Sequence, residues 1–451
     1  MLRLLVATTT QKDWEFRQID VKTAYLYGDL EEEIYIAVPE GLKGVPEGHV
    51  LQLIKALYGL KQAGCQWYKT LMGAMEKFSM KKIKSDPHIF IIQKSKKVLI
   101  ILIWVDDLFP FRDKHLVNDF KRWIPNYFDT SPPCDAHYFL GIHVTRNRTI
   151  EDPKPFIALN QISFIENALV TIERMYGKTI TVCKTVLPAA KIVPNKTPKV
   201  MADPRTVQVF QSAMGQLMYI MLATHPNLAY PVGMLAHHVS NPSLDHINTL
   251  FHLAGYLKQT IKQTLIFRKP ADNESEIGLI ESYTNTNWAG EMHSGRSTSG
   301  MLILKDTSPI SWSSRRQGTI STSTMESEYI TMYNTIQHTL WIRALETQMG
   351  ISDLKPRILC DNKAAIAIAT GGKMTFKKSR YMNVKYHWIR DVHKKKEVII
   401  NYVRSKDNIA DLFTKQLPHS TLCKLRGWFM EDYDKREDVE ATGAQESPDE
   451  E

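Results

Sequence analysis

The chain has 451 residues, of which 43% are hydrophobic and 23% charged, with a net charge of +9 at pH 7. This length fits two or three domains with ample cores, and five scattered cysteines argue against a disulfide framework or a structural zinc site. No stretch reaches the roughly 18 apolar residues of a membrane span, and the N-terminal apolar run is too short for a signal peptide, so we expect an intracellular, cytoplasmic protein.

Two β-like stretches carry the first candidate site. Residues 16–26 contain one carboxylate, Asp20, which alone would be typical of an edge or a turn. Residues 98–107 form an apolar run that stops on Asp106 and Asp107. Neighbouring carboxylates at the end of a buried strand repel each other unless a cation lies between them. The alternative for this pair is a solvated hairpin turn.

Taken together, these three carboxylates indicate a two-metal site. They could hold two Mg²⁺ ions about 3.5–4 Å apart. Such a pair stabilises the attacking and the leaving oxygen of a phosphoryl displacement, with little covalent work left to the protein. The residues therefore suggest nucleotidyl transfer.

Four stretches then occur in a recognisable order: residues 18–30, residues 56–63 with Gln66-Trp-Tyr68, Val105-Asp-Asp107, and residues 138–142. On them the chain resembles the reverse transcriptase of copia-type LTR retrotransposons, and the resemblance continues to about residue 418. It implies a polymerase palm over residues 1–150, an antiparallel sheet with helices. It also implies an RNA template, a DNA primer, dNTP substrates and two Mg²⁺ ions.

The resemblance implies roles for single residues. Asp20, Asp106 and Asp107 fall on the catalytic metal ligands. Tyr25 falls under the incoming sugar, where its ring would clash with a 2′-hydroxyl. Tyr58 and Gly59 match the turn that lines the nucleotide pocket. From the residues alone, Tyr25 could equally be an ordinary strand aromatic, and the other two a plain turn.

A further match concerns the primer. Residues 138–142 match the hairpin that grips the primer end. The alternative is a buried hairpin strand.

The chain also departs from the family pattern near this site. Trp104 stands where the family usually has Tyr, and Gly64-Cys65 where it tends to have Pro-Arg. Pro110 follows the Asp pair where a regular strand is expected. Because Pro cannot donate to a central ladder, we expect a distorted hairpin behind the catalytic turn.

The region before Asp20 is short. Only fifteen residues precede Phe16, with Arg3 and Lys12 as their cations. The family has a fingers region here that supplies basic residues for the triphosphate. We therefore expect truncated fingers and an impaired polymerase.

The middle of the chain is predicted to be mostly helical. Apolar spacing predicts helices over residues 161–177, 208–224 and 244–260. Four prolines, the last of them Pro204, predict a linker over residues 187–204. By resemblance, residues 151–270 are the thumb and connection.

From about residue 275 the pattern becomes strand-rich. Strands are expected near residues 277–283, 301–305, 310–313, 358–361 and 398–403. A helix is expected over residues 324–349 and a short one within residues 408–415. This order fits a mixed α/β sheet with helices packed on it.

Residues 271–425 resemble a copia-type ribonuclease H domain through residues 288–290, 296–300, 326–329, 360–362 and 410–415. Such domains use two Mg²⁺ ions held by four carboxylates. Glu326, Asp361 and Asp411 fall on three of those positions. Their alternatives are a capping box from Ser323, a helix cap and a solvated helix face, respectively.

The fourth carboxylate position is degenerate, because it holds Asn285. An amide keeps the shape of a carboxylate but removes the charge that bridges two cations. We therefore expect cleavage of an RNA–DNA hybrid to be abolished or severely weakened.

The C-terminal residues differ in charge from the rest. The last 21 residues carry ten acids against Lys435 and Arg436, so the remainder is more basic than +9 indicates. That balance suits a polyanionic partner, although evenly spread cations would indicate only a soluble basic protein. Residues 426–451 are predicted to be a disordered acidic tail.

The sequence thus predicts an α+β, mixed chain: a reverse transcriptase and ribonuclease H fragment of a copia-type retrotransposon. One alternative is a catalytically impaired remnant that at most binds nucleic acid. Another is a decayed reading frame whose product does not fold stably.

Overall fold

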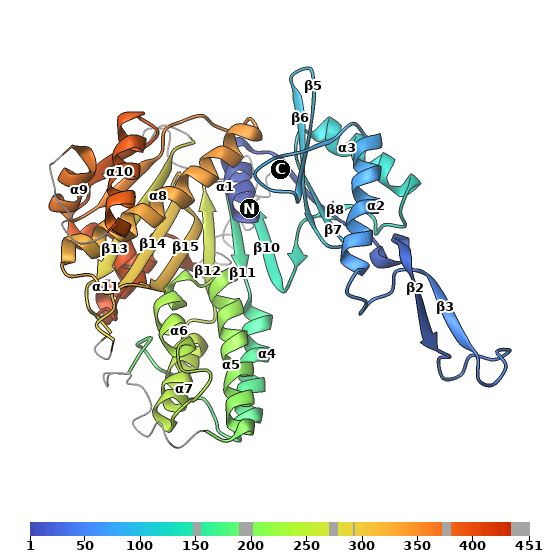
Figure 1. Ribbon diagram of the computed structural model, residues 1–451, viewed down its shortest axis with the longest axis horizontal. Coiled ribbons are helices and arrows are strands. Elements are labelled where there is room, and N and C mark those ends of the chain that lie inside the picture. The colour runs from blue at the N-terminus through green and yellow to red at the C-terminus, as the bar shows by residue number, and fades with distance from the viewer. Residues whose placement is uncertain (148–154, 189–201, 270–277, 292–293, 372–379, 434–451) are drawn as a thin grey trace, which may run out of the picture.

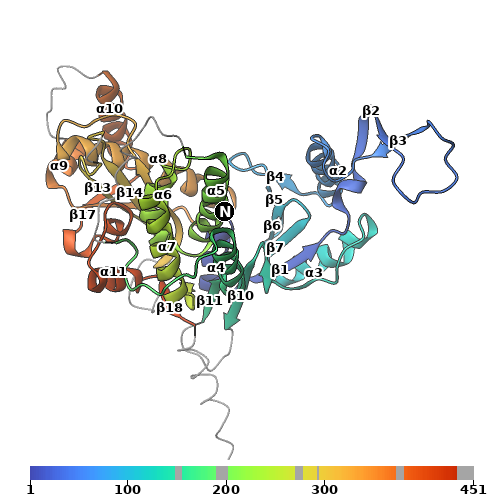
Figure 2. The ribbon, with the colours of Figure 1, turned by 90° about the horizontal axis from the view of Figure 1, so that it is seen from below.

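The computed structural model describes residues 1–147, 155–188, 202–269, 278–291, 294–371 and 380–433. Three multi-stranded sheets follow one another along the molecule, and a two-stranded hairpin projects from one end (Figures 1 and 2). The mixed α and β composition expected from the sequence is confirmed. None of the described helices combines the length and the apolar composition needed to cross a bilayer.

The first sheet has the strand order β4-β5-β6-β7-β1-β8. Its strands are β1 (Glu15–Asp20), β4 (Lys81–Lys82), β5 (Ile89–Lys94), β6 (Lys97–Trp104), β7 (Asp107–Arg112) and β8 (Cys134–Asp135). Ile101 and Ile103 of β6 pack with residues of α2 (Ala63–Lys77) and α3 (Lys114–Trp123), whereas Ile100 and Leu102 enter a different core cluster. Because β6 is buried on both faces, its sequence is continuously apolar rather than alternating.

The hairpin behind the Asp pair is regular, so the distortion expected from Pro110 is wrong. The register between β6 and β7 is unbroken, with Ile101 opposite Pro110. On its other edge β7 pairs with β1 at both ends, but not at Phe109 and Pro110. The ladder between β1 and β7 is thus interrupted at Pro110, which has no N–H to donate, whereas the hairpin of β6 and β7 keeps its register.

The projecting hairpin is formed by β2 (Asp29–Ala37) and β3 (Val50–Lys55). It follows the short turn η1 (Ala24–Tyr27). Gly28, which lies between η1 and β2, packs closely against α2. A Cβ on Gly28 would lie only 2.9 Å from Gln66 Cβ. Ile54 is 79% exposed, which shows how little of this hairpin is covered by the rest of the molecule.

The second sheet brings together distant parts of the chain in the order β18-β12-β11-β10-β9. Its strands are β9 (Tyr138–Phe139), β10 (Ile142–Asn147), β11 (Phe156–Asn160), β12 (Gln263–Arg268) and β18 (Met430–Asp432). The pairing of β10 with β11 crosses the boundary predicted at residue 150. Disorder from residue 426 onward is wrong for β18, because buried Met430 anchors that strand beside β12. The rest of the predicted tail, residues 434–451, lies outside the described residues.

Four helices pack below the second sheet (Figure 1). They are α4 (Ile162–Tyr176), α5 (Pro204–Ala223), α6 (Ala229–Ala236) and α7 (Leu244–Gln259). The three helices predicted in this region are confirmed. Pro204 opens α5 instead of ending the linker, because Pro is favoured at the first position of a helix and Asp203 caps the N–H groups of Arg205 and Thr206. Linker residues 189–201 lie outside the described part of the chain.

The third sheet has the order β15-β14-β13-β16-β17, and its mixed character is confirmed. Its strands are β13 (Ile280–Asn287), β14 (Thr298–Lys305), β15 (Ser308–Arg316), β16 (Arg357–Cys360) and β17 (Ile399–Tyr402). The first three are antiparallel, and β16 and β17 run parallel to β13. The remaining helices are α8 (Thr324–Gln348), α9 (Lys363–Thr370), α10 (Arg380–Lys394) and α11 (His419–Arg426).

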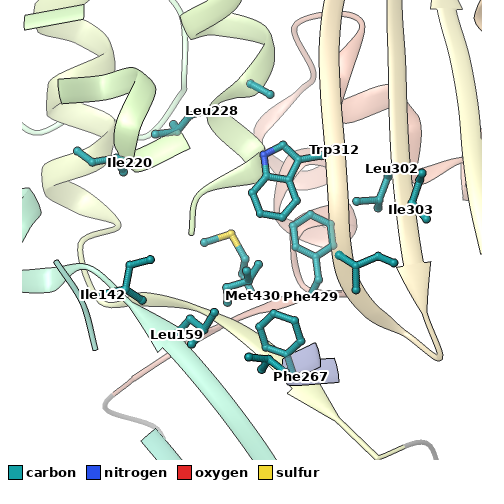
Figure 3. Close-up of a cluster of buried hydrophobic side chains, with 14 of the residues drawn as sticks. Ile142, Leu159, Ile220, Leu228, Phe267, Leu302, Ile303, Trp312, Phe429 and Met430 are labelled. Atoms are coloured by element: carbon teal, nitrogen blue, oxygen red, sulfur yellow. The ribbon is translucent and has the colours of Figure 1, made fainter. Parts of the chain in front are cut away.

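An N-terminal helix, α1 (Leu2–Lys12), was not expected. It packs against β11, β12, β14 and β15, and is buried from Leu4 to Gln11. A helix buried on all sides has no polar face and so lacks the periodic pattern that marks amphipathic helices. Around it, one apolar cluster joins the second and third sheets, including Leu159, Phe267, Trp312 and Met430 (Figure 3).

A buried ion pair ties β14 to α8. Lys305 Nζ lies 2.6 Å from Glu346 Oε1, and these side chains are 0% and 2% exposed. Lys305 Nζ also donates to the carbonyl of Gly278. Removing one member of such a pair strands the other charge in the core.

We expect Lys305→Met to destabilise the protein by about 3–5 kcal/mol, because Glu346 loses its buried counter-charge. The double variant Lys305→Met/Glu346→Leu should recover most of that loss, since neither member of the pair is then left in the core without its counter-charge. Urea unfolding followed by circular dichroism measures both. As a surface control, Asp119→Ala removes the exposed pair with Arg122 and should cost under about 1 kcal/mol. Equal losses for the buried and the exposed pair would contradict this account.

Candidate active sites

A strained turn presents the first Asp pair. Trp104 of β6 lies opposite Asp107 of β7, so Val105 and Asp106 form a two-residue loop. Val105 has φ of 56°, a left-handed conformation that β-branched residues rarely adopt. Trp67 of α2 holds it there by donating its indole N–H to the Val105 carbonyl at 2.6 Å. Strain of this kind is commonly stored at functional sites.

Antiparallel pairing brings Asp20 to the same place. Asp20, the last residue of β1, lies opposite Asp107, and the N–H of Val21 donates to the Asp106 carbonyl at 2.9 Å. Ser131 holds the Asp20 main chain from the other side, since its N–H donates to the Asp20 carbonyl at 2.9 Å. The three predicted carboxylates are therefore gathered at one edge of the first sheet.

The electrostatics of this edge fit a cation site. Burial, and then the neighbouring Asp106, raise the pKa of Asp20, with a smaller opposing effect of Lys22. Burial also raises the pKa of Asp107, opposed by Gln18, whose Nε2 donates to Asp107 Oδ1 at 2.9 Å. Carboxylates whose ionisation is disfavoured by each other gain most from a divalent cation placed between them. The residues present therefore fit an oxygen-ligated metal.

The predicted nucleotide residues lie beside these carboxylates. Tyr25 is in η1 and Tyr58 follows β3, and their ring centroids are 4.6 Å apart. Burial raises the pKa of Tyr58, with further contributions from Asp106, Tyr25 and Asp20. Gly59 has φ of 98°, a conformation that favours glycine. The structure thus brings Tyr25 and Tyr58 together with the Asp cluster.

The predicted primer hairpin is β9–β10. Its turn contains Leu140 and Gly141, both with positive φ, and the hydroxyl of Tyr219 on α5 donates to the Leu140 carbonyl. Tyr138 lies on the exposed side, with its ring centroid 4.6 Å from that of His143. The alternative, a buried hairpin strand, does not hold for Tyr138, which is 46% exposed.

The second candidate site lies at one edge of the third sheet. Asn285 is on β13, Asp361 follows β16, and Asp411 lies in the short helical turn η5 (Ile409–Phe413). Asn285 Nδ2 donates to Asp411 Oδ1. Of the four predicted positions, the structure therefore brings Asn285 and Asp411 into direct contact.

Glu326 does not join this group. Its Oε2 accepts from both the N–H and the hydroxyl of Thr322 at 2.8 Å, so it faces the start of its own helix. Glu328 takes its place, because two residues along an α-helix turn the side chain through about 200°. The prediction of Glu326 is corrected to Glu328, which the same Glu-Ser-Glu-Tyr stretch contains.

Glu328 is buried within the second site. It is 3% exposed, its Oε1 accepts from the Thr286 N–H at 3.1 Å, and its Oε2 is buried without a partner. Burial, and then the charge of Asp361, raise the pKa of Glu328 to about 8. Glu328, Cys360 and Asp361 have ligand atoms that all lie within 4.8 Å of one another, the one such group in the described part of the chain.

Asp411 is engaged by other groups. Lys415 Nζ lies 2.9 Å from its Oδ1, the same oxygen that accepts from Asn285. Burial raises the pKa of Asp411, whereas Lys415 and Asn285 act in the opposite direction. In a two-metal site this carboxylate would face a cation, but here it faces an ammonium group and an amide.

Comparison of the sequence with known proteins matches one family and several retrovirus-related Pol polyproteins. Residues 1–183 match the family described as reverse transcriptase (RNA-dependent DNA polymerase). The retrovirus-related Pol polyprotein from transposon TNT 1-94 of Nicotiana tabacum is 31% identical over 431 residues, which are 94% of this chain and 31% of that polyprotein. The corresponding polyprotein from transposon RE1 of Arabidopsis thaliana is 29% identical over 92% of this chain and 27% of its own length. The chain spans less than a third of either relative.

Among solved structures, LC11-RNase H1 isolated from compost aligns with 30% of this chain and 93% of its own, at 15% identity. The TM-score of this alignment is 0.25.

The raised pKa of Glu328 makes stability depend on pH. Folding raises the pKa of this carboxyl from its ordinary 4.5 to about 8. Its contribution to the stability of the folded protein is therefore complete below pH 4.5 and is lost progressively as the pH rises through 8. We expect Glu328→Gln, which stays neutral, to flatten this dependence and to be more stable than the unsubstituted protein at pH 8.5 by a few kcal/mol, on the order set by the shift.

Thermal unfolding between pH 5 and pH 8.5, with a chelator present, measures this dependence. Glu326→Gln is the matched control on the same helix, and it should leave the pH profile unchanged. Identical profiles for both variants would show that Glu328 does not titrate as described.

Proposed function

This chain corresponds to the reverse transcriptase and ribonuclease H-like region of copia-type retrotransposon Pol polyproteins, and from that premise we propose that it carries out RNA-directed DNA synthesis. The observation that carries the proposal is the gathering of Asp20, Asp106 and Asp107 at one sheet edge. These residues lie inside the stretch that matches the reverse transcriptase family.

In the proposed mechanism the three carboxylates would hold divalent cations of the Mg²⁺ class. Such cations, when bound, stabilise the attacking and leaving oxygens of nucleotidyl transfer. Burial and the neighbouring carboxylates raise the pKa of Asp20 and Asp107, so a bound cation would favour their ionised forms. The strained Val105 turn, held by Trp67, keeps Asp106 and Asp107 fixed at the strand end, so little reorganisation is needed.

The aromatic residues around the carboxylates serve the substrates. The Tyr25 ring would lie under the sugar of the incoming dNTP and exclude a 2′-hydroxyl. Tyr58 packs against Tyr25 and keeps that ring in place. Trp104 and Tyr138 are 54% and 46% exposed, and exposed rings beside a polymerase site can stack on bases of the RNA template and the DNA primer.

The second site supports a different conclusion, namely that hydrolysis of RNA in a hybrid is abolished or severely weakened. Asn285 supplies an amide in the place of a carboxylate, and its N–H donor points at Asp411. An amide adds no charge to offset a pair of dications. This observation favours the alternative function, a catalytically impaired remnant that binds nucleic acid, for the ribonuclease H-like part of the chain.

Primer extension on poly(rA)–oligo(dT) with Mg²⁺ tests the polymerase proposal. Although the sequence predicts an impaired polymerase, the gathered carboxylates predict measurable extension by the unsubstituted chain. Asp106→Asn should lose about two orders of magnitude or more of that extension, because a ligand charge is removed where charge develops. Asp119→Asn, an exposed acid on α3, is the control and should retain full activity.

The informative negative result is tight, salt-sensitive binding of primer and template without extension in any variant. It would reject the polymerase proposal in favour of the binding remnant, since phosphate contacts alone give a steep salt dependence.

Restoring the missing carboxylate tests the second site. We expect Asn285→Asp to gain Mg²⁺-dependent cleavage of an RNA–DNA hybrid that the unsubstituted chain lacks. Asn287→Asp is the matched control, because the Asn287 side chain is turned toward Gly290, where a Cβ would lie 2.3 Å from its Nδ2. Robust cleavage by the unsubstituted chain would refute the assigned defect.

A further inference from the structure

A charged cavity lies at the end of the first sheet that is remote from the Asp cluster. Its volume is about 650 Å³, and it is bordered by the start of β1, the turn before β6, the end of β7 and the start of α3. Arg112, which lines it, ends the strand that Asp107 begins. Five residue steps of about 3.3 Å each separate the two by roughly 16 Å. The cavity is therefore distinct from the first candidate site, and none of its lining residues belongs to the second.

Three of the lining residues are cations, namely Lys96, Arg112 and Lys114. Within the described part of the chain, none of the three forms an ion pair with a carboxylate. The Arg112 guanidinium instead donates through Nη1 to the carbonyls of Met349 and Gly350, at 3.2 and 3.4 Å. Burial lowers the pKa of Arg112, so an anion placed beside it would favour its charged form.

The acids that line the cavity are already engaged. Asp13 Oδ1 accepts from Arg146 Nη2 at 3.0 Å. Glu15 Oε2 accepts from Arg17 Nε at 2.9 Å. Asp113 caps the start of α3, where its side chain accepts from two backbone N–H groups. The charge left uncompensated in the cavity is therefore positive.

An aromatic ring and a strained residue shape this cationic wall. The Arg112 guanidinium lies 5.0 Å from the centroid of the Trp14 ring, a distance at which a cation and a ring attract each other. Arg112 has φ of 94°, which residues other than glycine rarely adopt. Strain of this kind persists where the surroundings fix a side chain for a purpose. The ring and the two carbonyls thus hold the guanidinium at the cavity.

We propose that this cavity binds a small oligophosphate anion. A planar guanidinium matches the geometry of phosphate oxygens, and two flexible ammonium groups supply further donors for a chain of phosphates. The volume lies within the range of small-molecule sites. Inorganic tripolyphosphate and the phosphate tail of a nucleotide share this chemistry. The inference goes beyond DNA synthesis at the first site and does not depend on it.

The position of Arg112 gives the bound anion a structural effect. Its two carbonyl partners lie at the C-terminal end of α8, and Lys12 Nζ donates to the next carbonyl, that of Ile351, at 2.8 Å. Arg112 therefore joins the first sheet to the helix that packs on the third sheet. An anion that binds only the folded protein raises its stability, and here it would also fix the residue that makes this connection.

Tripolyphosphate serves as the probe, in isothermal titration calorimetry of the full chain with a chelator present. Without divalent cations, the carboxylates of the first site repel the anion. We expect one saturable site per chain and a higher melting temperature. A parallel titration with ATP distinguishes the two sources of phosphate. Equal affinities would show that the phosphates alone are recognised, whereas tighter binding of ATP would show that the nucleoside also contacts the cavity.

Substitutions locate the site. Lys96→Ala and Lys114→Ala should each weaken tripolyphosphate binding by about tenfold, because each removes a charge-assisted hydrogen bond. Arg112→Met should weaken it further. Lys121→Ala is the matched control, since Lys121 lies on the same helix as Lys114 but outside the cavity, and its loss should leave the titration unchanged. Circular dichroism checks that each variant is folded.

Three results would overturn the proposal. One is the absence of saturable binding, and another is undiminished binding in the folded double variant Lys96→Ala/Lys114→Ala. The third is complete displacement of tripolyphosphate by a primer–template duplex, which would assign the cations to the backbone of a nucleic acid. None of these measurements uses primer extension, so failure here and failure of the polymerase proposal are separate results.

Discussion

The strand register between β1 and β7 is the constraint on which the first site depends. Because side chains alternate along a strand, a slip of one residue would send Asp20 to the opposite face of the sheet from Asp107. The register is fixed by apolar residues buried on both faces of the sheet, and it can tolerate Pro110 because the ladder has a gap there. The strained turn between β6 and β7 is tolerated, since the core holds both strands in place.

The third sheet follows the same principle with a different outcome. Parallel pairing of β13 with β16 brings the C-terminal ends of both strands to one edge, and α8 lays Glu328 across it. The side chains at this edge lie close together, but an amide stands where a carboxylate is expected. Asn285 occupies its position and donates to Asp411, so the arrangement persists through an amide hydrogen bond in place of a shared cation.

Sequence reasoning found what depends on pattern and missed what depends on three-dimensional context. The helices α4, α5 and α7 follow from apolar spacing, and the Asp cluster follows from strand ends that carry charge. The choice between Glu326 and Glu328 turns on which face of α8 meets the sheet, which a Glu-Ser-Glu stretch does not reveal. α1 was missed because burial on all sides leaves no periodic signal. β18 was missed because three residues are too few to outweigh an acidic surrounding sequence.

The sharing of one core by both ends of the described chain has a consequence for how the protein folds. Residues 2–12 pack against strands that include β14 and β15, and residues 430–432 complete a sheet begun near residue 138. Contacts of such long sequence separation form late and slowly. During synthesis α1 is made before all of these strands, so its apolar surface stays uncovered until they exist. Apolar surface that stays uncovered in this way makes an incompletely folded chain prone to aggregate.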